Sequence, residues 1–133
     1  MRHNTIIIVE GDAEMRSRLM HAFEDRGYIT WTCPGPEVAL SIFSTAHPNV
    51  VLLDLDEEES IALGLLDTWK KTCPETRVVV ESSFADAERM REAMNLGAYA
   101  FLIKPYSLPP LFELLEREIP PAHKITSTTP RVA

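Results

Sequence analysis

Four apolar runs in this chain each end at a side chain that could act on a phosphoryl group. Residues 6–9 precede Glu10, residues 50–53 precede Asp54, residues 78–80 precede Glu81 and Ser82, and residues 101–103 precede Lys104. In a parallel α/β sheet, ligands bind beyond the carboxyl ends of the strands. If the four runs are neighbouring strands, an acid, a carboxylate nucleophile, a hydroxyl and a cation meet in one crevice.

The elements that would position these side chains alternate between strand and helix five times. Apolar and β-branched runs predict strands at 5–9, 28–33, 50–54, 77–81 and 100–103. Helices are predicted at 13–26, from Pro36 to the break at Pro48, at 60–72, at 85–96 and from the cap Ser107 to 119. Such an alternation predicts a parallel sheet with helices on both faces.

Helical periodicity assigns one inward face to each of four helices. The predicted inward residues are Met15, Leu19, Ala22 and Phe23; Val38, Ala39, Ile42 and Phe43; Met90, Ala93 and Met94; and Leu111, Leu114, Leu115 and Ile119. Asp12 is the predicted N-cap of the first helix. The uninterrupted apolar strand 50–54 should be buried on both faces.

Length and composition predict one globular domain. The chain has 133 residues, 45% of them hydrophobic, and 20 acidic against 13 basic side chains, for a net charge of -7. This charge disfavours nucleic-acid and anionic-membrane binding, and there is no apolar run of transmembrane length. Cys33 and Cys73 are expected to be free thiols. Residues 1–119 should form the domain, and we expect 120–133 to be a disordered tail or the start of a linker.

The fragments IIIVEGD, VVLLDLD, VVVESSF and FLIKPY, in this order, resemble the receiver domain of bacterial two-component response regulators. The resemblance runs from Thr5 to Ile119. It implies a flavodoxin-like, doubly wound (βα)5 fold with a five-stranded parallel sheet in the order 2-1-3-4-5, similar to the chemotaxis regulators. It also implies a phosphoprotein in phosphorelay signal transduction.

The resemblance assigns a role to each candidate site residue. Asp54 matches the phosphoacceptor, Ser82 and Lys104 match the side chains that contact the phosphoryl group, and Phe101 matches the aromatic switch position. Because Ser83 is next to Ser82, either serine could supply the matching hydroxyl. Phe101 could equally be a residue that only fills the core. The bond from Lys104 to Pro105 would be cis, as is usual in the family.

Mg²⁺ is the cofactor that the resemblance implies, and the chain departs from the family at the position that binds it. Receivers carry two adjacent acids after the first strand, whereas this chain has Glu10 and then Gly11. The remaining ligands would be Glu10, Asp54 and the backbone carbonyl of Asp56, with Asp12 as an alternative if the loop shifted. Because Mg²⁺ requires hard oxygen ligands in near-octahedral geometry, its affinity should be weakened or lost.

The loop after the acceptor is a second departure. It reads Asp54-Leu55-Asp56-Glu57-Glu58-Glu59. These acids either form an ordinary solvated loop or create a negative potential that acts on Asp54. The Asp56 carboxylate could also orient a water and speed dephosphorylation. Glu81 is a third unusual acid, which would either partner Lys104 or point to solvent.

Three functions remain open at this point. The first is a stand-alone response-regulator receiver that takes a phosphoryl group on Asp54 from a histidine kinase or phosphotransfer protein. It would signal through its helix 4–strand 5–helix 5 surface to an unknown output protein. The second is a degenerate receiver that acts as a protein–protein interaction module independently of phosphorylation. We expect either one to be cytoplasmic, a monomer or weak homodimer, without direct contact to nucleic acid or membrane.

The third function is enzymatic, because Asp54-Leu55-Asp56 resembles the nucleophile motif of haloacid-dehalogenase-like phosphatases. That family places its nucleophile on the first strand, whereas Asp54 ends the third predicted strand. The chain also has no room for a substrate-capping domain. The expectation is therefore that the protein is not an enzyme beyond an autocatalytic phosphoacceptor.

Overall fold

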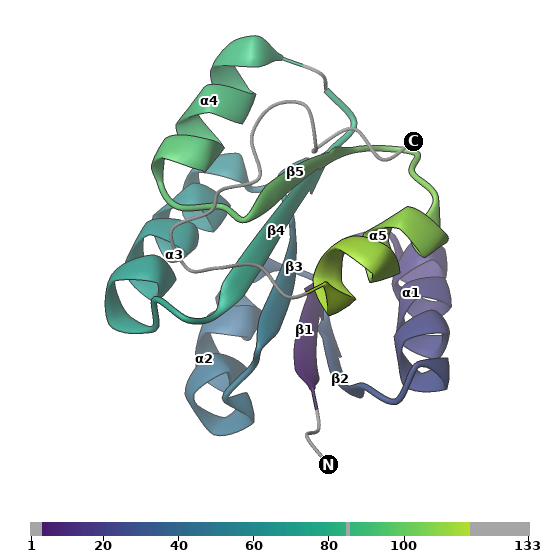
Figure 1. Cartoon of the computed structure of the whole chain (residues 1–133). Coiled ribbons are helices and arrows are strands. Elements are labelled where there is room, and N and C mark those ends of the chain that lie inside the picture. Colours follow the sequence, from purple (N-terminus) through teal and green to yellow (C-terminus); the bar gives the residue numbers. More distant parts are fainter. Residues whose placement is uncertain (1–3, 85, 118–133) are drawn as a thin grey trace.

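The computed structural model describes residues 4–84 and 86–117, which form five strands and five helices in alternation (Figure 1). The elements are β1 (Thr5–Val9), α1 (Ala13–Asp25), β2 (Ile29–Cys33), α2 (Pro36–Ala46), β3 (Val50–Asp54), α3 (Glu59–Thr72), β4 (Arg77–Ser82), α4 (Ala87–Asn95), β5 (Ala100–Ile103) and α5 (Leu108–Glu116). All strand pairs are parallel, in the order β2-β1-β3-β4-β5. The doubly wound, flavodoxin-like fold is therefore confirmed.

The helices cover both faces of the sheet, as Figure 1 shows, with α1 and α5 on one face and α2, α3 and α4 on the other. The α1/α5 face is packed by Phe23, Leu111 and Phe112, against the strand side chains that point to that side. The opposite face is packed by Phe43 and Trp69. β3 is buried along its whole length, as expected for a central parallel strand.

The local signals explain most element boundaries. The Asp12 carboxylate accepts the N–H groups of Glu14 and Met15 and so caps α1. Gly27 and Gly97, after α1 and α4, have φ values of 91° and 107°, a region that glycine enters without strain. The Lys104-Pro105 bond is cis, as the resemblance implied. Cys33 and Cys73 are free.

Some predicted details were wrong. α4 begins at Ala87, because Asp86 is its N-cap and accepts the Glu88 N–H. α5 ends at Glu116, with Arg117 in an extended conformation. Val38 is 45% exposed, since α2 turns Ala39 and Phe43 to the core and Val38 lies about 100° away from that face.

Two predictions lie outside the described residues, and a third concerns membrane-spanning helices. The inward position of Ile119 and the tail or linker at 120–133 lie outside the described ranges. Within those ranges, no helix is both long and apolar enough to cross a membrane.

Candidate phosphoryl-transfer site

The predicted site residues meet at one edge of the sheet, where β1, β3, β4 and β5 end, and we call this the carboxyl edge. The register pairs Asp54 with Glu81 and Ser82 with Ile103, so consecutive strands end almost level. Glu10 follows β1 directly and Lys104 follows β5 directly. Sheet topology therefore brings together the acid, the carboxylate, the hydroxyl and the cation that lie far apart in the sequence.

Lys104 is the centre of the carboxyl edge. Its Nζ lies 3.1 Å from Asp54 Oδ1, 3.3 Å from Glu10 Oε1 and 3.3 Å from Asp56 Oδ2. Burial acts to lower the pKa of Lys104, but the carboxylates, with Glu81 first, outweigh it and raise that pKa above its ordinary value. The ammonium is therefore a permanent positive charge among the acids.

Asp54 is held in place by two donors on the same oxygen. Its Oδ1 accepts Lys104 Nζ and the Asp56 N–H, the latter at 3.0 Å. The side chain is only 7% exposed. In the part of the chain that the structure describes, Asp54 Oδ2 accepts no hydrogen bond.

The Asp56 carboxylate faces inward and binds the two serines at the end of β4. Its Oδ1 accepts Ser82 Oγ at 2.9 Å and the Ser83 N–H at 2.9 Å, and its Oδ2 accepts Ser83 Oγ at 2.8 Å. Burial acts to raise the pKa of Asp56, but the Ser83 N–H and then the serine hydroxyls outweigh it, so that pKa is lowered. Asp56 is therefore ionised, and both serines contact it.

Gly11 leaves a space that another acid fills. A Cβ added at Gly11 would lie 2.9 Å from both carboxylate oxygens of Glu57, in the loop after β3. Glu57 is exposed, and Glu10 beside Gly11 is buried. Burial is the main cause that raises the pKa of Glu10.

The structure places a cation of the protein itself, the Lys104 ammonium, among the side chains that were predicted to bind Mg²⁺. Its distances to Asp54 and Glu10 are 3.1 Å and 3.3 Å, so it lies where a metal would need the oxygens of these two residues. Asp12 is used as a helix cap. Among the described residues, no three His, Cys, Asp or Glu side chains are grouped as metal ligands.

Glu81 is fully buried, so the idea that it points to solvent was wrong. Tyr106 Oη donates to Glu81 Oε2 at 3.2 Å, whereas Glu81 Oε1 lies 3.9 Å from Lys104 Nζ, beyond hydrogen-bond length. Burial, followed by the charge of Glu10, raises the pKa of Glu81 well above its usual range. Glu81 thus lies near Lys104 without a hydrogen bond between them. Tyr106, which donates to Glu81, is a site residue that sequence reasoning missed.

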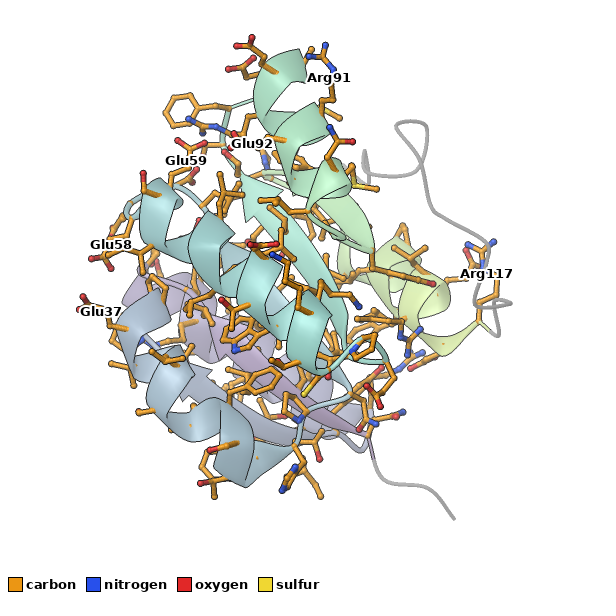
Figure 2. The ribbon with its side chains drawn as sticks, turned by 90° about the vertical axis from the view of Figure 1, so that its left-hand side faces the viewer. Glu37, Glu58, Glu59, Arg91, Glu92 and Arg117 are labelled. Carbon is orange, nitrogen blue, oxygen red and sulfur yellow. The ribbon has the colours of Figure 1, made fainter. Side chains whose placement is uncertain are left out.

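Arg89 on α4 is a second residue that the sequence did not reveal. Its Nη1 donates to Ser82 Oγ at 3.2 Å, and its Nε and Nη2 lie 2.8 Å and 3.0 Å from the Glu59 carboxylate at the start of α3. Figure 2 shows Glu59 with Glu37, Glu58 and Glu92 at the edge formed by α2, α3 and α4, so the surroundings are acidic. An arginine in an amphipathic helix gives no sequence signal for such a contact.

Phe101 lies on β5 and is completely buried, in the core between the sheet and α2, α3 and α4. Its ring therefore occupies the inward position. Ser82 ends β4 and is buried, whereas Ser83 follows the strand and is exposed, and the hydroxyls of both contact Asp56.

Comparisons with known proteins agree with this geometry. The profile of the response regulator receiver domain matches residues 6–116. The chain is 30% identical to the regulatory protein AtoC of Escherichia coli over 87% of its own length and 25% of that protein. It is 24% identical to the sporulation initiation phosphotransferase F of Bacillus subtilis, over 90% of this chain and 97% of that protein.

Solved structures show the same fold. A CheY-like response regulator receiver domain protein from Methanospirillum hungatei superposes with a TM-score of 0.80 at 22% identity, covering 86% of this chain and 92% of that one. NtrX from Brucella abortus, in a structure with ATP, gives a TM-score of 0.74 at 30% identity, covering 87% of this chain and 26% of that one. The chain thus spans about a quarter of AtoC and of NtrX.

Proposed function

The chain belongs to the family of response regulator receiver domains of two-component systems, and on that premise we propose that it accepts a phosphoryl group on Asp54. The donor would be the phosphohistidine of a histidine kinase or of a phosphotransfer protein. The observation that carries the proposal is the contact of 3.1 Å between Lys104 Nζ and Asp54 Oδ1, at the edge where Ser82 also ends its strand.

The chain's own residues supply the nucleophile, a cation and a hydrogen-bond donor for this transfer. Asp54 Oδ2 forms the new bond to phosphorus, the bond from phosphorus to the donor's imidazole nitrogen breaks, and the imidazole keeps the electron pair. Lys104 offsets the charge that the carboxylate and the phosphoryl oxygens bring together. Ser82 Oγ can then donate to a phosphoryl oxygen, in place of its bond to Asp56.

Mg²⁺ binding is proposed to be weakened or lost relative to receivers with two adjacent acids. Gly11 contributes no carboxylate, and Lys104 Nζ lies between Glu10 and Asp54. When bound in a receiver, the metal supplies positive charge beside the acceptor, a role for which this chain offers Lys104.

Signalling is proposed to run through the surface formed by α4, β5 and α5 to a protein partner. Arg89 supports this route, since it connects Ser82 at the carboxyl edge to α4. We further propose a cytoplasmic protein, a monomer or weak homodimer without direct nucleic-acid contact, and no catalytic turnover of phosphatase substrates.

Intact-mass spectrometry after incubation with acetyl phosphate tests the acceptor role. We expect a phosphoryl adduct on the wild-type protein and none on Asp54→Ala. Parallel samples with Mg²⁺ and with EDTA measure how far the reaction depends on the metal. An adduct of equal size on Asp54→Ala would contradict the assignment of the acceptor.

The second candidate function is the phosphorylation-independent interaction module. The specific observation in its favour is the Asp56 carboxylate, which already contacts Ser82 and Lys104. Absence of any adduct, while a receiver with two adjacent acids is labelled in parallel, would support this second function over the first.

A further inference from the structure

Four hydrogen-bond donors surround the carboxylate of Asp56. They are Ser82 Oγ, Ser83 Oγ and the Ser83 N–H, at 2.8–2.9 Å, and Lys104 Nζ at 3.3 Å. Two hydroxyls, a backbone amide and an ammonium, all aimed at one point, are what a tetrahedral or planar oxyanion requires. The donors form an oxyanion site, and the chain fills this site with its own side chain.

The oxyanion site is connected to α4 by the hydroxyl of Ser82. While Ser82 Oγ donates to Asp56, it accepts the Phe84 N–H at 3.1 Å and Arg89 Nη1 at 3.2 Å. All the hydrogen-bonding capacity of this hydroxyl is therefore used. Arg89 continues the network to Glu59 on α3 and stacks over the ring of Phe84, which is 58% exposed.

We propose that Asp56 is the resident anion of this site, and that it holds the contact between Ser82 at the end of β4 and Arg89 on α4 in place without any covalent modification. An exposed aromatic ring, Phe84, and the first turns of α4 are thereby presented in one fixed arrangement. The inference goes beyond the proposed function, since it requires neither a phosphoryl donor nor a reaction at Asp54.

The negative charge of Asp56 is essential to this role. A carboxylate presents two acceptor oxygens, which face Ser82 and the Ser83 N–H on one side and Ser83 Oγ and Lys104 on the other. Asparagine would keep one acceptor and turn an NH₂ group toward the ammonium of Lys104. An external anion could enter the site only by displacing the Asp56 carboxylate.

Amide hydrogen exchange measured by NMR tests the proposal, with the amides of Ser83 and Phe84 as reporters. The first donates to Asp56 and the second to Ser82 Oγ. In Asp56→Ala we expect both amides to exchange faster by about tenfold or more, with increased exchange in the first turn of α4. Asp56→Asn should have an intermediate effect, and serves alone if the alanine variant does not fold.

Glu57→Gln is the matched control, because Glu57 is the next acid in the same loop and, among the described residues, no hydrogen bond or ion pair joins it to either serine. Inorganic phosphate should slow exchange of both amides again in Asp56→Ala and leave the wild type unchanged. Unaltered exchange of Ser83 and Phe84 in Asp56→Ala would overturn the proposal. A response of the wild type to phosphate as large as that of the variant would also overturn it.

Discussion

Gly11 stands where the receiver resemblance implies a second acid, and the side chain beside it in space is that of Glu57. The atoms that a Cβ at Gly11 would meet belong to the end of the flexible Glu57 side chain. Gly11 does not have a left-handed φ, so another residue brings no backbone strain there. A second acid can therefore be restored by a single substitution.

Gly11→Asp is predicted to restore Mg²⁺ binding. Without metal, the variant should melt at a lower temperature than the wild type, because a further carboxylate joins an acidic edge. With Mg²⁺ at about 100 times its Kd, binding should stabilise the variant by about 2.7 kcal/mol, which thermal unfolding with and without the ion measures. Gly11→Asn has the same size without the charge, and a Mg²⁺ response of this control equal to that of Gly11→Asp would contradict the prediction.

The sequence predicted which residues reach the site better than it predicted what they touch. Asp54, Ser82 and Lys104 could be placed because each follows an apolar strand, and strand order then brings them together. The contacts of Asp56 with Ser82 and Ser83 depend on side-chain torsions and on the path of one loop, for which the sequence has no periodic signal.

At the scale of elements, α2 and α3 are joined by one aromatic pair. The rings of Phe43 and Trp69 are stacked, with centroids 4.7 Å apart and planes 8° apart, and Trp69 is 2% exposed. Both helices follow strands that end at the carboxyl edge, so their packing supports the loops of the site.

Trp69→Ala is therefore predicted to destabilise the protein by about 3–5 kcal/mol, through lost burial and the cavity left beside Phe43. Urea unfolding followed by circular dichroism measures the loss. Trp69→Phe keeps an aromatic ring and should lose clearly less. A loss below about 1 kcal/mol in the alanine variant would show that the α2–α3 contact does not support the fold.

Element types could be predicted from the sequence because both periodicities are strong in this chain, but several boundaries could not. Asp86 was predicted to lie inside a helix. It is instead the N-cap of α4, since its carboxylate accepts the Glu88 N–H. Val38 is apolar and next to a core position, yet α2 leaves it at the surface. In both places, tertiary geometry decides between two choices that are equally compatible with the local sequence.

For the whole molecule, the buried acid Glu81 makes stability depend on pH. Its pKa is raised in the folded state, so the folded protein binds a proton that the unfolded chain releases above about pH 4.5. The stabilisation that protonated Glu81 contributes is complete below the ordinary pKa of glutamate. It is lost as the pH rises through the raised pKa of Glu81 in the folded protein. Stability should therefore fall from weakly acidic toward neutral pH.

Glu81→Gln is predicted to flatten this decline, because glutamine has the same shape and does not titrate. A single such group accounts for a slope of at most about 1.4 kcal/mol per pH unit. Urea unfolding at several values between about pH 5 and pH 8 measures the slope. The exposed Glu75→Gln is the control and should behave as the wild type. Equal slopes for the wild type and Glu81→Gln would refute this account.

The strand order of the whole sheet came from the family resemblance, since alternation of strands and helices alone does not fix which strands are neighbours. Length led to the expectation of one domain, and the described residues form one five-stranded sheet. The burial of Glu81 was not predictable, because a charged residue at a strand end is solvated in most proteins.

The order in which the sheet is built from the chain has a consequence for synthesis on the ribosome. β1 is second from one edge of a sheet whose last strand to be made, β5, lies at the other edge. Asp54 leaves the ribosome before Lys104, so a nascent chain holds the proposed acceptor carboxylate without its cation. The carboxyl edge is complete only when β5 has joined β4, so the proposed reaction at Asp54 would require that the chain has been made through Lys104 and that β5 has paired.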